Sequence, residues 1–196
     1  MSFTPNPNFR KKIASIINEE LNIYDILAKH KNSEIVHKTA TGYVLLNPFD
    51  QIVKITNDKI EYENALKFME RPSKLFVKYF SAKVLGDGMY ELIMDKLEPL
   101  NSKEWDIVDL IQQSLGAQSY MLDQQKRTAF VFEMKNNPEY YEEFAASLEE
   151  VVAFMNLLKK MYQEAQARNI VLYDLRAQNI GKTRNGNYVH FDIGRG

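Results

Sequence analysis

Cysteine is absent from this chain of 196 residues, and its absence excludes disulfide bonds, thiolate metal sites and cysteine nucleophiles. Long apolar runs are absent as well: no segment is long enough to span a bilayer, and the first residues, MSFTPNPNFRKK, have no apolar signal-peptide core. Neither sign of charge is in excess, since 25 basic and 26 acidic residues give a net charge of −1. We therefore expect a cytoplasmic protein with no electrostatic reason to bind nucleic acid or an anionic membrane.

Histidine is scarce, with three residues, His30, His37 and His190, far apart in the sequence and without a carboxylate cluster around them. A zinc site is therefore not expected. What is present is ordinary globular composition, with 45% hydrophobic and 26% charged residues. The length suffices to bury a core, either as one domain or as two small lobes.

The first half of the chain predicts one helix followed by mostly β-structure. Asn8 can cap a helix over 9–29, which carries an apolar stripe. The range 34–56 predicts two strands joined through a turn at 47–50, and 59–71 looks helical. A second pair of strands is predicted around the turn Gly86-Asp87-Gly88.

Beyond Pro99 the pattern changes to helix. One helix is predicted to start near Ser102, and a longer one is predicted to start with Asn137 as cap and Pro138 in the first turn. The apolar stripe of the longer helix contains Phe144, Leu148, Val151, Val152, Met155, Leu158, Met161 and Ala165. The fold class is therefore α+β, with a first unit over 1–98 and a second over 99–196.

The final segment, NIVLYDLRAQNIGKTRNGNYVHFDIGRG, contains the Asn-Gly pair that is typical of a tight hairpin turn. A two-residue turn centred on Asn185 and Gly186 places Asn179 opposite Asp192. Asp174 precedes Asn179 closely, so three oxygen-bearing side chains are expected to converge, as a hard-cation site with a base requires. Taken singly, each of these residues has an alternative role as a turn cap.

Two strings in this segment, DLRAQN from Asp174 and DIG from Asp192, resemble the catalytic loop and the Asp-Phe-Gly motif of protein kinases. The resemblance implies that Asp174 accepts or orients the proton of a substrate hydroxyl. It implies further that Asn179 and Asp192 hold Mg²⁺ on the phosphates of ATP. Arg176 would take the place of the loop lysine that steadies the transferred phosphoryl group.

The first half is similar to the same family. Lys54 in QIVKIT matches the strand lysine that contacts the nucleotide phosphates, with Glu63 as its expected acidic partner and Glu61 or Glu70 as alternatives. The stretch YELIMDKLEPL resembles the hinge, where backbone groups of Asp95 and Leu97 would bond adenine. The stretch HKTATGYVLL resembles the phosphate-covering loop, with Gly42 at the point of close approach.

The sequence departs from the kinase pattern at four places. Gly42 stands alone where the family has three glycines, Leu172 and Tyr173 replace His-Arg, and Ile193 replaces phenylalanine. The sequence also stops two residues after Gly194, so the activation loop and the helices that seat a protein substrate are not in it. We expect the nucleotide half of a kinase without its substrate half.

The resemblance as a whole implies a two-lobed, kinase-like fold. It has an antiparallel β-sheet lobe with helices, and a reduced, mainly helical second lobe that ends in a β-hairpin. It implies a magnesium-dependent, ATP-binding phosphotransferase of unidentified acceptor. A protein partner or a second copy would complete the substrate side, and the host cytoplasm would be its location if it is phage-encoded. The alternatives are a non-catalytic pseudokinase or protein-binding module on a truncated kinase scaffold, and a plain α+β structural protein.

Overall fold

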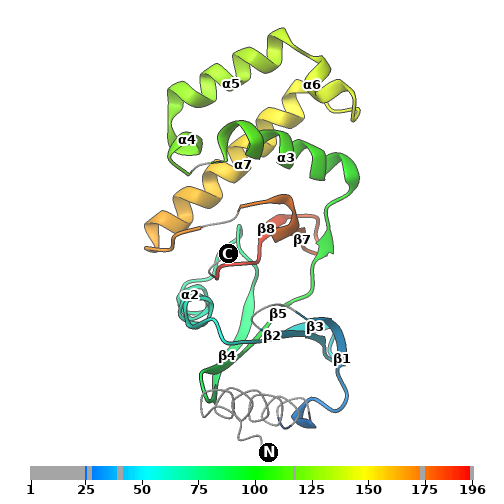
Figure 1. The fold of residues 1–196 in the computed structure, drawn as a ribbon, viewed down its shortest axis with the longest axis vertical. Helices are drawn as coiled ribbons and strands as arrows, with labels where there is room; N and C mark the ends of the chain where they lie inside the picture. Colours follow the sequence, from blue (N-terminus) through cyan, green and yellow to red (C-terminus); the bar gives the residue numbers. More distant parts are fainter. Residues whose placement is uncertain (1–24, 26–27, 39–41, 117, 173–174, 195–196) are drawn as a thin grey trace, which may run out of the picture.

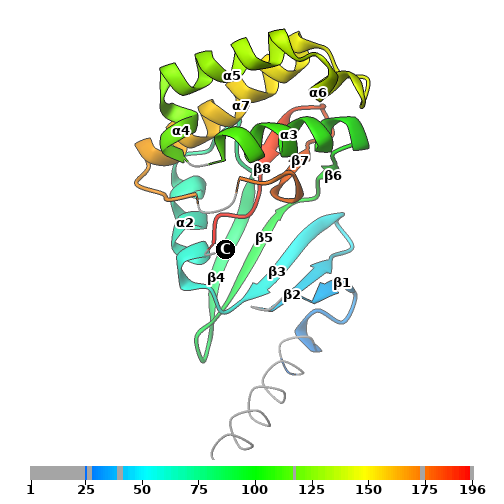
Figure 2. The ribbon, with the colours of Figure 1, turned by 45° about the horizontal axis from the view of Figure 1, so that its top comes forward.

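The computed structural model describes residue 25 and residues 28–38, 42–116, 118–172 and 175–194 (Figure 1). An antiparallel sheet of five strands lies at one end of the molecule and a group of helices at the other. The last described residues run between these two parts (Figure 2). The α+β class predicted from the sequence is therefore confirmed, while the helix predicted over 9–29 falls almost wholly outside the described residues.

The first sheet has the strand order β1-β2-β3-β5-β4. Its members are β1 (Glu34–Lys38), β2 (Gly42–Leu46), β3 (Gln51–Thr56), β4 (Tyr79–Gly86) and β5 (Met89–Asp95). The prediction of two strands over 34–56 is wrong, because three strands form there. The predicted turn at 47–50 is confirmed, and the Asn47 side chain organises it by accepting hydrogen bonds from the N–H groups of Phe49 and Gln51.

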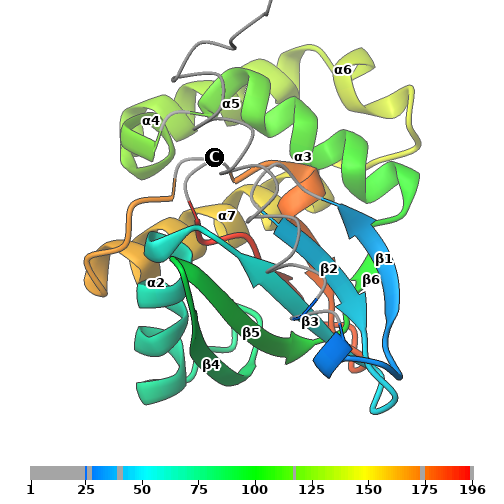
Figure 3. The same cartoon turned by 60° about the horizontal axis from the view of Figure 1, so that its bottom comes forward.

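Helix α2 (Lys59–Glu70) follows β3 and lies alongside β4 and β5 (Figure 3). Asp58 starts the helix by accepting hydrogen bonds from the N–H groups of Ile60 and Glu61, as an N-cap aspartate does. The predicted helix over 59–71 and the strand pair around Gly86-Asp87-Gly88 are both confirmed. All three residues of that turn have positive φ, a conformation that glycine adopts without steric cost.

The helical part contains α3 (Ser102–Leu115), α4 (Gln118–Leu122), α5 (Gln124–Asn136), α6 (Glu139–Glu142) and α7 (Leu148–Ala167). The predicted start near Ser102 is confirmed, with Asn101 and Glu104 in a capping box. The predicted start of the longer helix at Asn137 is wrong, because Asn137 ends α5 and only one short turn comes after it. Ala145 then adopts φ 56°, and α7 begins at a second capping box of Ser147 and Glu150.

The second sheet, β6 (Glu98–Pro99), β7 (Ile180–Lys182) and β8 (Tyr188–His190), joins the end of the first sheet to the tail hairpin. The hairpin forms as predicted, but its register is shifted by one residue. Ile180 pairs with His190 and Gly181 with Val189. The Thr183 N–H donates to the Asn187 carbonyl in the same register, so the loop has three residues instead of two. Gly186 takes the positive φ that such a loop needs, at 76°.

One hydrophobic core crosses from the first sheet to the helices. It includes Phe68 of α2 and Leu92 of β5, continues through Ile111 of α3 and Leu158 of α7, and reaches Ile193 of the tail. A smaller cluster of Leu45, Val53 and Ile55 covers the opposite face of the sheet. Because a single core joins both parts, the tail is packed as an integral element. No helix within the described ranges is long and apolar enough to cross a membrane.

Candidate functional site

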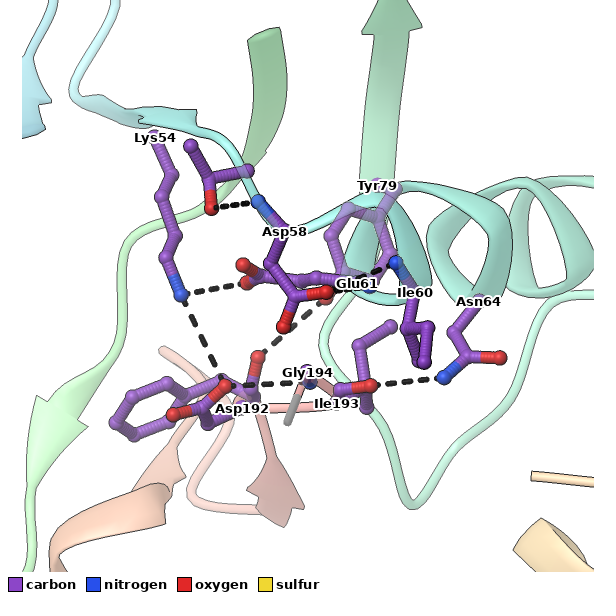
Figure 4. A network of polar contacts seen from close by, with 11 residues as sticks. Lys54, Asp58, Ile60, Glu61, Asn64, Tyr79, Asp192, Ile193 and Gly194 are labelled. Carbon is purple, nitrogen blue, oxygen red and sulfur yellow. Dashed lines mark hydrogen bonds and ion pairs between the residues drawn. The ribbon is translucent and has the colours of Figure 1, made fainter. Parts of the chain in front are cut away.

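Lys54 belongs to a polar cluster in which the side chains of Lys54 and Glu61 are largely buried and that of Asp192 is partly exposed (Figure 4). Its strand, β3, is hydrogen-bonded to β2 on one side and to β5 on the other, which fixes the direction of the side chain. Lys54 Nζ lies 2.6 Å from Glu61 Oε1 and 3.8 Å from Asp192 Oδ1. The side chains of Lys54 and Glu61 are 15% and 2% exposed, so this ion pair is largely removed from water.

The expected pairing of Lys54 with Glu63 is wrong, and the alternative Glu61 is the partner. Glu63 instead forms an exposed ion pair with Lys59, with 3.3 Å between Nζ and Oε1. The reason is the helical period: Glu61, Asn64 and Phe68 lie on the buried face of α2. Glu63 comes two residues after Glu61 and therefore points to another side of the helix.

Negative charge is in surplus around Lys54, because Asp58, Glu61 and Asp192 supply three carboxylates for one ammonium group. Burial raises the pKa of Glu61, and Asp192 and Asp58 raise it further, against the effect of Lys54. Burial lowers the pKa of Lys54, but attraction to Glu61, Asp192 and Asp58 outweighs it, so that pKa is raised. Both groups therefore hold their protons more tightly than in water.

The tail residues 191–194 fit closely against α2. The Gly194 N–H donates to Asp192 Oδ1 at 3.3 Å, which folds the tail back at this point. A Cβ atom at Gly194 would lie 2.6 Å from Asp58 Oδ2 and 3.2 Å from Glu61 Cβ. A side chain larger than glycine would therefore displace the Asp58 carboxylate, whose other oxygen accepts the capping hydrogen bond from the Ile60 N–H.

The hairpin brings Asn179 beside the tail, one residue away from the predicted position. The Phe191 N–H donates to the Asn179 carbonyl at 3.0 Å, so Asn179 lies opposite Phe191 and not opposite Asp192. Asn179 is buried, whereas Arg176 is exposed and its carbonyl accepts a hydrogen bond from the Asn179 N–H. Asp174 lies outside the described residues. The convergence of Asp174 with Asn179 and Asp192 stays a prediction.

The hinge-like residues lie at the junction of the two sheets. The Asp95 N–H donates to the Lys78 carbonyl at 3.0 Å, and Leu97 packs so tightly on Gly181 that a Cβ there would lie 2.8 Å from Leu97 Cβ. Gly42 lies in β2 opposite Thr56 of β3. A Cβ atom at position 42 would collide with the carbonyl oxygen of Ile55 in β3. Strand packing thus explains this glycine, and its contact with phosphates stays a prediction.

Sequence reasoning missed two residues of the cluster. Asp58 was recognisable as a helix cap, but its approach to the tail depends on tertiary packing. Tyr79, whose hydroxyl donates to the Phe191 carbonyl at 3.4 Å, had no sequence signal at all. Burial, with Glu61 and Asp192 nearby, raises the pKa of Tyr79 well above its ordinary value, so its hydroxyl stays protonated.

Three carboxylates surround Lys54, yet within the described ranges no group of three or more His, Asp or Glu side chains is arranged to hold a metal ion by itself. Comparison of the chain with protein-family models gives no match, and comparison with curated proteins gives no significant relative. The chemistry open to this protein must therefore be inferred from the geometry of the Lys54 cluster.

Proposed function

We propose that the chain is a kinase-like, magnesium-dependent phosphotransferase that uses ATP, on a two-lobed scaffold with a reduced second lobe. One observation carries the proposal: the buried Lys54–Glu61 pair with Asp192 at 3.8 Å from Lys54 Nζ. A lysine placed centrally in a sheet and oriented by a helix glutamate is the arrangement that protein kinases use for nucleotide phosphates. In the tail, the motif with Asp174 and Asn179 comes before the motif with Asp192, which is the order of the corresponding motifs in protein kinases.

The residues around Lys54 fit a divalent cation once phosphate is present. The Lys54 ammonium balances the charge of one of the three nearby carboxylates. The charge of the other two favours the binding of Mg²⁺. Magnesium is usually held by one or two carboxylates together with phosphate oxygens, which agrees with the lack of a self-sufficient protein cage among the described residues. Bound there by Asp192 and Asn179, Mg²⁺ would neutralise the charge of the phosphate oxygens.

The adenine end would lie against the connector between the two sheets. Because the Asp95 N–H is already bonded to the Lys78 carbonyl, Asp95 would bind adenine through its carbonyl, and Leu97 would bind it through its backbone groups. Gly42, at the start of β2, would lie over the phosphates. The Lys54 ammonium would contact phosphate oxygens while Glu61 keeps it in place.

Transfer requires an acceptor hydroxyl, whose oxygen forms a bond to the γ-phosphorus as the bond from that phosphorus to the bridging oxygen of ADP breaks. Asp174 takes the hydroxyl proton, and Arg176 steadies the transferred group. Because Arg176 is exposed, the acceptor would approach from solvent. The acceptor is a small molecule, the chain itself, or a surface completed by a partner.

Incubation with ATP labelled at the γ-phosphate tests the proposal. Wild-type protein with Mg²⁺ is expected to release or transfer the label, and chelation of the metal should stop the reaction. Asp174→Asn and Asp192→Asn should each lower the rate by at least about a hundredfold, as expected for loss of a catalytic proton acceptor or of a metal ligand. An absence of turnover, unchanged in these variants, would overturn the enzyme proposal.

A non-catalytic binding module is the second candidate, and one surface favours it. A shallow, mainly apolar groove of about 390 Å³ runs along α5, and Phe132 on it is 69% exposed. A binding module would use this apolar surface to contact a partner. A thermal-shift measurement separates the two candidates. No stabilisation by saturating Mg-ATP favours the binding module, and stabilisation without turnover indicates a nucleotide-sensing pseudoenzyme.

A further inference from the structure

Helix α2 and strand β4 together hold the tail through main-chain carbonyls on both sides of Asp192. The Asn64 amide nitrogen donates to the Ile193 carbonyl at 2.8 Å, and the Tyr79 hydroxyl donates to the Phe191 carbonyl at 3.4 Å (Figure 4). Asn64 is 4% exposed, so its hydrogen bond is formed away from water. If the Ile193 carbonyl moved away, the buried Asn64 amide would be left without a hydrogen-bond acceptor, which costs free energy. This cost favours the observed position of the tail.

Lys67 determines which way the Asn64 amide points. Lys67 Nζ donates to Asn64 Oδ1 at 3.2 Å and to the Asn169 carbonyl at 3.2 Å. Because an ammonium group only donates, it fixes the oxygen of the amide on its own side and leaves the nitrogen facing Ile193. A chain of hydrogen bonds thus runs from the end of α7, through α2, to the tail.

The C-terminal end of α2 is fixed to α7 by a second contact. The Arg168 guanidinium donates to the Arg71 carbonyl, pairs with Glu164 at 2.7 Å, and lies 4.6 Å from the centre of the Phe68 ring. Basic side chains at this position satisfy the last carbonyls of a helix. The helix that carries Asn64 therefore has a defined place relative to α7.

We propose that Asn64 is a positioning residue, which sets Asp192 opposite Lys54 by holding the Ile193 carbonyl. Glu61 lies one turn before Asn64 on the same buried face of α2. One helix thus positions the partner of Lys54 directly and the tail carboxylate through the Ile193 main chain. The consequence for catalysis rests on the proposed phosphotransferase function, whereas the coupling of α2 to the tail does not.

An uncharged amide is the group that this position requires. Asp58, Glu61 and Asp192 already place a surplus of negative charge nearby. A carboxylate at position 64 would have nearly the same shape, but it would face the Ile193 carbonyl with an acceptor and add charge of the same sign. Asn64→Asp therefore removes the contact while changing little of the packing.

Amide hydrogen exchange in the ligand-free protein tests the coupling. The Phe191 N–H is bonded to the Asn179 carbonyl and the Gly194 N–H to Asp192 Oδ1, so both report on the docked tail. Loss of one buried hydrogen bond should speed their exchange about tenfold in Asn64→Asp. Lys67→Met, which keeps Asn64 and changes a partly exposed side chain, should speed the same amides by a smaller factor.

Arg127→Met is the matched control, because it breaks another buried bond from a side chain to a carbonyl, 2.7 Å from Arg127 Nη1 to the Met121 carbonyl. That bond lies in the helical part, so exchange at Phe191 and Gly194 should not change. Two results would overturn the inference: unchanged exchange in both Asn64→Asp and Lys67→Met, or equal acceleration in Arg127→Met. The second result would mean that the tail responds to global stability alone.

A magnesium titration at fixed ATP then connects the coupling to the site. Asn64→Asp should need about tenfold more Mg²⁺ for half-maximal ATP binding, in line with the loss of one buried hydrogen bond at the positioning contact. Arg127→Met should match the wild type. If the wild type binds no Mg-ATP, the proposed function fails, while the exchange experiment still decides the role of Asn64.

Discussion

Glu61 Oε1 lies 2.6 Å from Lys54 Nζ, and this buried contact joins the central strand of the first sheet to helix α2. Removing Glu61 leaves the largely buried Lys54 with the longer contact to Asp192, which is 3.8 Å away and 38% exposed. Glu61→Ala should therefore lower the free energy of unfolding by about 3 kcal/mol, the lower end of the range for breaking a buried pair. Urea denaturation measures the change.

Glu63→Ala on the same helix is the matched control. Its ion pair with Lys59 is exposed, so the free energy of unfolding should change by no more than about 0.5 kcal/mol. Similar losses in the two variants would contradict the assignment of Glu61 as the partner of Lys54.

Gly194→Ala should disturb the site more than the fold. The added methyl would meet the Asp58 carboxylate, whose other oxygen caps α2 and cannot turn away without losing that cap. We expect a loss of about 1–3 kcal/mol in the free energy of unfolding, as overpacking produces, together with weaker nucleotide binding. Thermal denaturation and a nucleotide titration measure the two effects.

Gly186→Ala is the control for Gly194→Ala. It introduces backbone strain in the hairpin loop without adding a contact to α2. Gly186 has φ 76°, so alanine there should cost about 1–2 kcal/mol in backbone strain and leave nucleotide binding unchanged. If both glycine variants change binding equally, the close approach of Gly194 to α2 is not what matters.

Glu104 should make stability depend on pH in the acidic range. Burial raises its pKa, but hydrogen bonds from Tyr188, from the Asn101 N–H and from Lys182 outweigh burial and hold that pKa below 4.5. The folded state then binds fewer protons than the unfolded state, so the stabilisation is present above pH 4.5 and is lost as the pH falls through the lowered pKa. Glu104→Gln should be less stable than the wild type at pH 7, and this difference should shrink as the pH falls below 4.5.

The matched control for this prediction is Glu98→Gln, because Glu98 is exposed on the neighbouring strand β6. Its difference from the wild type should stay near zero across the same range. A difference for Glu104→Gln that is independent of pH would show that packing, and not the ionised carboxylate, supports the link between α3 and the hairpin.

Ser147→Ala should weaken α7, since Ser147 caps that helix. The expected loss is about 1 kcal/mol of unfolding free energy. Asn137→Ala should cost less, because Asn137 is the C-cap of α5 and the hydrogen bond from its side chain to the Glu133 carbonyl is exposed. Denaturation of the two variants measures both values, and a larger loss at Asn137 would contradict the observed start of α7.

Local signals predicted most of the fold. Asp58, Asn101 and the turn glycines Gly86 and Gly88 are residues whose own chemistry starts a helix or permits a turn. The predicted start of the long helix was wrong because Asn137 and Pro138 are residues that often begin a helix. The break at Ala145 could not be predicted, because alanine is not a residue that favours a positive φ. The predicted register of the hairpin was wrong by one residue, because an Asn-Gly pair is compatible with loops of two and of three residues.

The candidate site was predictable only where a single residue type was decisive. Lys54 in an apolar strand and Asp192 in the tail were named from the sequence, and the structure brings these two side chains within 3.8 Å of each other. The partner Glu61 could not be chosen over Glu63, because that choice depends on which face of α2 packs against the sheet. Asn64 acts on the tail main chain, a contact that side-chain patterns do not encode.

Calorimetric titration of ATP in saturating Mg²⁺ tests most directly whether the Lys54 cluster binds nucleotide phosphates. The double variant Lys54→Met/Glu61→Gln removes both charges of the buried pair. The control variant Lys59→Met removes the lysine of the exposed Lys59–Glu63 pair on α2. We predict magnesium-dependent binding by the wild type and by Lys59→Met. Affinity should be at least about tenfold weaker in the double variant, equivalent to about 1.4 kcal/mol. No binding by the wild type, or equal affinity in the double variant, would contradict a phosphate site at Lys54.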